Sequence, residues 1–403
     1  MGKESKKPFQ AEEKRVSCNF ISKKILIPLI LSLLCYTNSY PNNDSTRSSG
    51  IAKSSGAAQE DPVKGVWLTN VCSDALDSRA NIIKAVEFCR EVGINHIFVV
   101  TWNRAATTYP SRVAAAVTGS EIEQRFAGRD PLKELIEESH KKGIKVHAWF
   151  EFGFSCSYKE EDGGVIIRNN PHWASKDIDG KLVSKNDFQW MNPFHPQVQD
   201  FMIALIKEVV TNYNIDGIQG DDRLPALPST GGYDPYTTEL YKREHNNNPP
   251  PSNYRDTSWV NWRADKLTEF LGRLYRETKE IKPNIIVSMA PSIHPWAKEE
   301  YLQDWPEWLR RGYCDLIIPQ VYRHTIEAYK TTLNEQLKYL RPQERELFYP
   351  GVLIQVEDNV IPSNQMFEEI IRFNREKGFK GETLFYYEGL KHFKEILIKH
   401  KNH

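Results

Sequence analysis

Acidic side chains at the ends of apolar runs are the first feature of the sequence that could carry out chemistry. Asp221 and Asp222 follow the short apolar run that begins at Gly217, and Glu151 ends the run that begins at Lys145. Cleavage of a glycosidic bond needs two carboxyl groups: one protonates the leaving oxygen, and the other attacks the anomeric carbon or activates a water. The sequence therefore predicts a hydrolytic site built from Asp221, Asp222 and Glu151.

The two adjacent aspartates are expected to differ in role. Neighbouring side chains of an extended segment point to opposite sides, so one faces the interior while the other lines a loop or pairs with Arg223. We favour Asp221 as the inward carboxylate, with Glu151 as its partner because neighbouring strands lie about 4.8 Å apart. Glu388 is the reserve candidate, and Asp216, which precedes its strand, is expected to be structural.

Aromatic and polar side chains at nearby strand ends could hold a sugar. Flat aromatic faces stack on sugar rings, and amide or imidazole groups hydrogen-bond to hydroxyls. For each aromatic ring a place in the core is the alternative, and His147, in the middle of its strand, is expected to be a core histidine. The predicted substrate-binding residues are Trp102, Asn103, Trp149, Gln219, Arg223, His294, Gln320, Tyr322 and Glu388.

From Lys64 onward, short apolar runs alternate with longer amphipathic segments, which is typical of repeated parallel strand–helix units. The runs are continuous rather than alternating in polarity, as expected for strands buried on both faces. An α/β fold with a closed (β/α)8 barrel is predicted; the rival is a doubly wound open sheet, disfavoured because no Gly-rich phosphate loop follows the first strand. The predicted strands are Gly65–Thr69, His96–Trp102, Lys145–Glu151, Gly217–Asp221, Ile285–Ala290, Leu316–Tyr322, Leu347–Leu353 and Thr383–Tyr387.

Capping residues and glycines mark the ends of the connecting helices. Asp130-Pro131 supplies an N-cap and a first-turn proline, and Gly143 ends the same helix. Ser78, His195 and Ser363 are expected to begin three further helices. The connections after the predicted third and fourth strands are long. They follow strand carboxyl ends, the catalytic face of such barrels, so they are expected to build the substrate cleft.

The bulk composition excludes some classes of partner. With 53 basic and 53 acidic residues the net charge is zero, whereas a nucleic-acid-binding protein usually carries a basic excess. The six cysteines show no metal-knuckle spacing, and Cys89 and Cys314 are expected to be buried thiols. We therefore predict no nucleic-acid partner, no cofactor and no metal. The sequence does not determine the oligomeric state.

Residues 1–39 predict a signal peptide or membrane anchor. Basic residues precede an apolar run from Ile25 to Leu34 of about ten residues, which is too short to span a bilayer and is typical of a secretory signal. Lipid attachment at Cys35 is disfavoured because the bulky Leu34 precedes it. Residues 40–61 are predicted to be a disordered linker, and 62–398 the barrel. The predicted location is the periplasm or cell envelope, with or without membrane attachment, or the exterior of the cell.

Five sequence blocks occur in one order along the chain: Gly65–Asn70, Phe126–Pro131, Val146–Glu151, Asp216–Arg223 and Ile318–Arg323. Together they resemble the glycosyl hydrolase-like 10 family, a bacterial and usually exported group of (β/α)8 barrels, over roughly residues 62–390. The resemblance implies cleavage of a bacterial glycan. The family's link to the cell envelope implies peptidoglycan sugar strands, notably those without peptides. Many relatives carry a clean lipoprotein signal, from which this sequence departs.

Two alternatives remain open. A catalytically silent, carbohydrate-binding barrel of the envelope is one, because the predicted fifth and sixth strands end without a carboxylate, the latter around Gln320. A metal-dependent hydrolase is the other, because His147, Glu151, Asp221 and Asp222 are acceptable metal ligands. However, no strand carries the H-x-H pattern common in barrel metallohydrolases.

Overall fold

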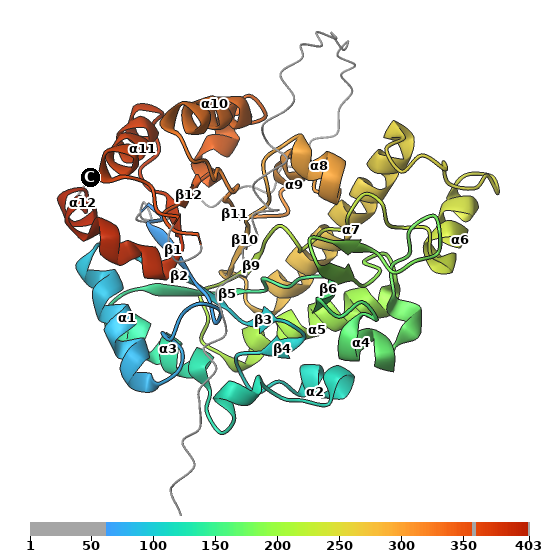
Figure 1. The fold of residues 1–403 in the computed structure, drawn as a ribbon, viewed down its shortest axis with the longest axis horizontal. Coiled ribbons are helices and arrows are strands. Elements are labelled where there is room, and N and C mark those ends of the chain that lie inside the picture. Colours follow the sequence, from blue (N-terminus) through green and yellow to red (C-terminus); the bar gives the residue numbers. More distant parts are fainter. Residues whose placement is uncertain (1–61, 357–359, 402–403) are drawn as a thin grey trace, which may run out of the picture.

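Eight parallel strands form the centre of the computed structural model, which describes residues 62–356 and 360–401 (Figure 1). The predicted signal and linker lie outside the described residues. Each strand falls within a predicted one, which confirms the predicted fold, although all eight are shorter than expected. The strands are β1 (Gly65–Leu68), β2 (His96–Val100), β5 (Lys145–Trp149), β9 (Gly217–Gly220), β10 (Ile286–Met289), β11 (Leu316–Ile317), β12 (Gly351–Leu353) and β13 (Thr383–Phe385).

Backbone pairing closes the sheet into a barrel. The strand order is β11-β10-β9-β5-β2-β1-β13-β12, so β11 and β12 are the two ends. Parallel bridges join Ile317 to Phe348 and Gln320 to Gly351, and thereby connect the segments that contain these two strands. A closed barrel leaves no free strand edge and brings the carboxyl ends of all eight strands to one face. The rival doubly wound sheet is therefore wrong.

Helices surround the strands, and the predicted caps are confirmed. The side chains of Ser78, Asp130, His195 and Ser363 each accept a hydrogen bond from a backbone N–H of the following turn. Each cap satisfies a donor that has no partner within its helix. The longer helices are α1 (Arg79–Glu91), α3 (Pro131–Lys141), α5 (Pro196–Asn212), α7 (Thr257–Ile281), α10 (Ile326–Leu337) and α11 (Asn364–Glu376). The shorter ones are α2 (Arg112–Thr118), η2 (Gln124–Phe126), α4 (Gly164–Asn169), η3 (Pro171–Trp173), α6 (Pro235–Glu244), α8 (Trp296–Tyr301), α9 (Trp305–Arg310), η4 (Pro342–Leu347), η5 (Tyr387–Phe393) and α12 (Lys394–Lys399).

The connections at the carboxyl ends of the strands contain short strands and helices. A short hairpin of β3 (Trp102–Asn103) and β4 (Ala106–Thr107) follows β2. The long connection after β5 forms an antiparallel sheet of β6 (Ser155–Tyr158), β8 (Phe188–Trp190) and β7 (Ser184–Lys185). The connection after β9 contains α6. In Figure 1, β6, α4 and α6 lie on the opposite side of the molecule from α1, α11 and α12.

Polar side chains pair inside the barrel. Trp67 of β1 donates through Nε1 to Gln219 Oε1 of β9 at 2.7 Å, although two other strands separate β1 from β9 in the sheet. His96 Nδ1 and His147 Nε2 lie 2.8 Å apart, and both rings are buried. A Cβ at Gly217 would lie 2.1 Å from His147 Nδ1, so only glycine fits there. His147 is therefore a core residue, as predicted.

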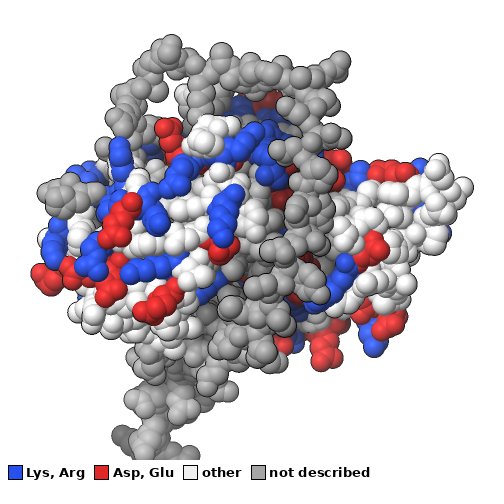
Figure 2. Space-filling view, turned by 90° about the horizontal axis from the view of Figure 1, so that it is seen from above, with Lys and Arg blue, Asp and Glu red and all other residues white. Residues whose placement is uncertain are grey.

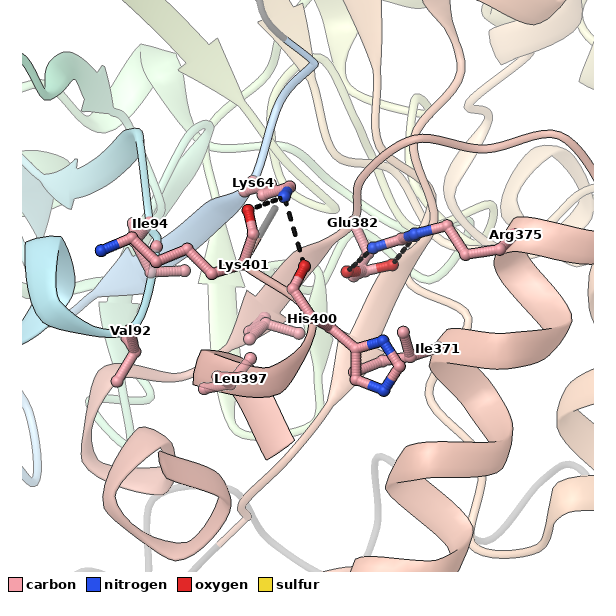
Figure 3. Close-up of a pocket in the computed structure, with 11 residues that line it drawn as sticks. Lys64, Val92, Ile94, Ile371, Arg375, Glu382, Leu397, His400 and Lys401 are labelled. Carbon is pink, nitrogen blue, oxygen red and sulfur yellow. Dashed lines mark hydrogen bonds and ion pairs between the residues drawn. The ribbon is translucent and has the colours of Figure 1, made fainter. Parts of the chain in front are cut away.

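The last helix, α12, ends beside the residue that leads into β1 (Figure 3). Lys64, just before β1, donates through Nζ to the carbonyl oxygens of His400 and Lys401, at 3.5 and 2.6 Å. An ammonium group at this position satisfies carbonyls that the end of α12 leaves unpaired. Arg375 and Glu382 form a two-pronged ion pair beside it, with contacts of 2.8 and 3.0 Å. The small cavity among these residues thus lies at the opposite end of the strands from the predicted site.

The surface carries charges of both signs. Basic and acidic side chains are interspersed on the visible part of the face in Figure 2, in agreement with the zero net charge. Cys89 and Cys314 are buried thiols, as predicted. Within residues 62–356 and 360–401, no helix is both long and apolar enough to cross a membrane.

Candidate active site

Three carboxyl groups surround one guanidinium at the carboxyl ends of β5 and β9. Arg223 Nη2 lies 3.3 Å from Glu151 Oε1 and 3.8 Å from Asp221 Oδ2, and Nη1 lies 3.2 Å from Asp222 Oδ1. Arg223 Nε also donates to the backbone carbonyl of Glu151 at 2.9 Å. Because the guanidinium is planar and holds its N–H donors in fixed directions, Arg223 fixes the three acids relative to one another.

The inserted sheet after β5 packs directly against Arg223. The guanidinium carbon lies 4.8 Å from the centre of the Phe188 ring in β8. The backbone N–H of Phe154 donates to the carbonyl of Arg223 at 3.0 Å. The backbone at Gly153 lies so close to Arg223 that a Cβ at this position would be 2.1 Å from the Arg223 carbonyl oxygen. Gly153 also has a left-handed φ of +49°, which favours glycine for a second reason.

Asp221 is the buried member of the cluster, with 3% of its side chain exposed. Its carboxylate accepts hydrogen bonds from Trp149 Nε1 at 2.9 Å and from the backbone N–H of Arg223 at 3.0 Å. Burial, with the nearby charge of Asp222, raises the pKa of Asp221 well above its usual value, against the effect of Arg223. Asp221 therefore points inward, as predicted, but has little surface with which to meet a substrate.

Glu151 and Asp222 are the two partly exposed acids, with 19% and 20% of their side chains accessible. Asn103 Nδ2 donates to Glu151 Oε2 at 3.0 Å. Burial raises the pKa of Glu151 to about 7; the charge of Arg223 acts against this rise and that of Asp222 adds to it. A carboxyl group with a pKa near neutrality can give up a proton and take it back during one reaction cycle.

Two tyrosines border Asp222. Burial and the charge of Asp222 together raise the pKa of Tyr322 and of Tyr301 above their usual value. Tyr322 follows β11 and was predicted from the sequence, whereas Tyr301 was missed because it ends α8, remote in sequence from a strand end. The Tyr301 hydroxyl accepts a hydrogen bond from Asn186 Nδ2 at 3.1 Å. Asn186 lies in the turn between β7 and β8, so this hairpin contacts α8 beside the acids.

Three predicted substrate-binding side chains lie in the core. Trp102 and Gln219 have no exposed surface, and Trp149 is 3% exposed. A ring that stacks on a sugar must expose a face, so this prediction is wrong for Trp102 and Trp149. Trp149 instead holds Asp221, and Gln219 bonds to Trp67 across the barrel rather than to a substrate hydroxyl.

Three other predicted residues contact groups outside the Arg223 cluster. Glu388 Oε1 accepts a hydrogen bond from Ser73 at 2.8 Å. The His294 ring packs edge-on against Tyr339, with ring centres 4.5 Å apart. Gln320 donates through Nε2 to a backbone carbonyl at 3.0 Å. Their roles in substrate binding therefore remain predictions. Asp216 is structural, as predicted, because its carboxylate accepts the backbone N–H at the start of β5 and contacts a histidine of α3.

A guanidinium occupies the position among the acids that a metal cation would need. Among the residues that the structure describes, no three or more His, Cys, Asp or Glu side chains are grouped to hold a metal ion. His147, a candidate ligand in the sequence, bonds to His96 inside the barrel instead. The arrangement is suited to acid–base chemistry by the carboxyl groups themselves.

Comparison with known proteins agrees with this chemistry. The family model described as "Glycosyl hydrolase-like 10" matches residues 62–368. The chain belongs to the glycosyl hydrolase-like 10 family. This family member is 26% identical over 341 residues to glycosyl hydrolase DigH of Escherichia coli K12, and the aligned region covers 74% of each chain. It is 24% identical over 302 residues to glycosyl hydrolase YngK of Bacillus subtilis, and this aligned region covers 66% of this chain and 55% of that protein.

Solved glycoside hydrolases share the fold of this family member. The glycoside hydrolase domain of PgaB (BpsB) from Bordetella bronchiseptica has a TM-score of 0.63 at 12% identity, over 84% of this chain and 98% of that one. The catalytic domain of Paenibacillus polymyxa β-amylase has a TM-score of 0.58 at 10% identity, over 86% and 100%. The likeness in structure shows the barrel, and family membership makes the protein a glycoside hydrolase.

Proposed function

We propose that this enzyme cleaves glycosidic bonds in the sugar strands of peptidoglycan, with Glu151 and Asp222 as the reacting carboxyl groups. The observation that carries the proposal is the geometry around Arg223, which holds two partly exposed carboxyl groups side by side on the catalytic face. The exposure of Asp222 and the burial of Asp221 move our preference from Asp221, favoured by the sequence, to Asp222.

Each acid has a distinct part in the proposed reaction. Glu151 gives its proton to the glycosidic oxygen as the bond to the anomeric carbon breaks, which its pKa of about 7 permits near neutral pH. Asp222 either attacks the anomeric carbon or takes a proton from the attacking water. Asp221 is a positioning residue, because it contacts Trp149 and Arg223 and has almost no exposed surface.

The proposed substrate rests on the sequence. The resemblance of the five blocks implies a bacterial glycan, and residues 1–39 have the pattern of an export signal. An exported hydrolase of this family would meet peptidoglycan in the cell envelope. We therefore also propose that the protein acts outside the cytoplasm, in the envelope or beyond it.

Purified glycan strands without peptides provide the test. Wild-type enzyme is expected to release soluble fragments that mass spectrometry identifies, and Glu151→Gln or Asp222→Asn is expected to lower the rate by about a thousandfold, since general acid–base catalysis contributes 10²–10⁴. Glu161→Gln is the matched control, an exposed acid in the same long connection after β5. Wild-type turnover in the Glu151→Gln and Asp222→Asn variants would show that the site is wrongly assigned.

The same assay separates the alternatives. Retention of glycan strands without any cleavage after long incubation would favour the catalytically silent barrel. Cleavage of plain polysaccharides but not of peptidoglycan strands would keep the enzyme class and overturn the proposed substrate.

A further inference from the structure

A chain of hydrogen bonds leads from Glu151 to a surface loop on the catalytic face. Asn103 in β3 donates through Nδ2 both to Glu151 Oε2 and to Asn70 Oδ1, each at 3.0 Å. Asn70, just after β1, donates in turn through Nδ2 to Glu123 Oε2 at 2.7 Å. Glu123 lies on the connection that leads into α3. Four segments that are distant in sequence therefore meet in one line of contacts.

The carboxylates at both ends give this chain a direction. An amide group donates from its nitrogen and accepts at its oxygen, whereas an ionised carboxylate only accepts. Glu123 therefore requires the nitrogen of Asn70, which leaves the Asn70 oxygen to accept from Asn103. Asn103 then has one N–H bound to Asn70 and one bound to Glu151. A flip of either amide would break two hydrogen bonds.

The outer end of the chain is anchored by Arg125. Its Nη2 donates to the backbone carbonyl of Asn70 at 2.6 Å, and its Nε lies 3.5 Å from Glu123 Oε1 and 3.4 Å from Asp77 Oδ1. Asn70 and Asn103 are only 8% and 3% exposed, so water is a poor substitute for their protein partners. The orientation of both amides is thus set by the surrounding protein.

We propose that Asn70, Asn103 and Glu123 are positioning residues that orient Glu151 and set its proton affinity through this chain of amides. The inference rests on the proposed function of Glu151 as the general acid. An N–H directed at Oε2 favours the ionised carboxylate, whereas a flipped Asn103 would present its oxygen and favour the protonated form. The other charged groups that face Glu151 are Arg223, Asp221 and Asp222 after β9, and Arg104 in the β3–β4 turn. Glu123 makes no hydrogen bond to Glu151, but Arg104 lies near both carboxylates. Glu123→Gln, which removes the charge and keeps an acceptor oxygen, therefore separates the effect of the chain from the effect of the charge.

The pH dependence of kcat/KM tests the proposal. A general acid must be protonated, so activity falls as pH rises through the pKa of Glu151 and this fall forms the alkaline limb of the profile. In Glu123→Leu, Asn70 loses its acceptor, and the alkaline limb is expected to move up by about one pH unit. Glu123→Gln retains an acceptor oxygen and is expected to restore the limb to its wild-type position. Glu121→Leu, an exposed acid on the same connection, is the matched control.

A direct titration of Glu151 separates this proposal from the proposed function. The carboxyl carbon of Glu151 is followed by ¹³C NMR in labelled protein and assigned by its loss in Glu151→Gln. The pKa of Glu151 is expected to rise in Glu123→Leu and in Asn103→Leu, which removes the N–H donor to Oε2 without adding a charge. Should Glu123→Leu not fold, Asn103→Leu alone decides. An unmoved Glu151 pKa in the folded variants overturns the proposal, whereas full activity of Glu151→Gln overturns only the assigned catalytic role.

Discussion

Arg223 supplies one positive charge to three carboxyl groups in a setting with little water. Burial alone would lower the pKa of the guanidinium, but the charges of Asp222, Asp221 and Glu151 raise it instead. Burial, with the charges of the neighbouring acids, outweighs the effect of Arg223, so the pKa values of Asp221 and Glu151 are raised. The cluster therefore retains protons at a pH at which ordinary carboxyl groups have lost them, as a general acid requires.

Replacement of Arg223 should lower both the stability and the activity of the enzyme. Arg223→Met leaves three acids without their shared partner, and removal of one member of a buried ion pair costs about 3–5 kcal/mol. We expect a decrease of that order in the free energy of unfolding, measured by urea denaturation, together with loss of turnover. Arg168→Met breaks an exposed ion pair with Asp162 and should not change the denaturation midpoint. Equal midpoints for the two variants would contradict the role given to Arg223.

At the scale of elements, the inserted sheet after β5 acts as the support of the acid cluster. Phe188 of β8 lies under the guanidinium, and the backbone near Gly153 bonds to the carbonyl of Arg223. Asn186, at the β7–β8 turn, bonds to Tyr301 of α8. The long connection after β5 therefore has a structural reason for its length, because it contacts both Arg223 and α8.

Two glycines with left-handed backbone offer a matched test of this support. Gly153→Ala would place a Cβ 2.1 Å from the Arg223 carbonyl oxygen, whereas a Cβ at Gly128 meets nothing within 4 Å. Both substitutions carry the strain of a positive φ, about 1 kcal/mol. Gly153→Ala should lower the melting temperature and the catalytic rate well beyond Gly128→Ala. Similar melting temperatures and rates for the two variants would show that the close approach is unimportant.

At the scale of the whole molecule, the barrel interior contains a histidine pair that resists protonation. Burial lowers the pKa of His96 to about 3 and the pKa of His147 well below its usual value. In the unfolded chain a histidine titrates near pH 6.5, about as in free peptides. Between the low pKa of the native histidines and about pH 6.5, the unfolded state binds protons that the native state does not. The pair therefore contributes stability that is lost as pH falls through this range.

Replacement of one histidine should therefore change the acid stability of the barrel. As pH falls from about 6.5 to 4, the free energy of unfolding of wild type is expected to decrease relative to that of His96→Gln. The slope should approach 1.4 kcal/mol per pH unit for one proton. Chemical denaturation at several pH values measures it. His172→Gln, at an exposed site, is the control for the loss of one imidazole. A difference between wild type and His96→Gln that does not change with pH would contradict the prediction.

The sequence by itself determined the barrel and the region of its site. Strand positions, helix caps and the acids at strand ends were readable because each depends on short-range patterns of polarity and turn residues. The predicted acids Glu151, Asp221 and Asp222 do meet, since parallel strands of a closed barrel end on one face.

Only the tertiary structure decided which side chains face the solvent and which hold others in place. The burial of Trp102 and Trp149, and the exposure of Asp222 rather than Asp221, depend on the packing of loops that begin far away along the chain. The contacts from Asn70 to Asn103 and to Glu123 join residues 33 and 53 positions apart. No local pattern encodes such contacts, because they form only when the closed barrel brings the ends of β1, β2 and β5 together.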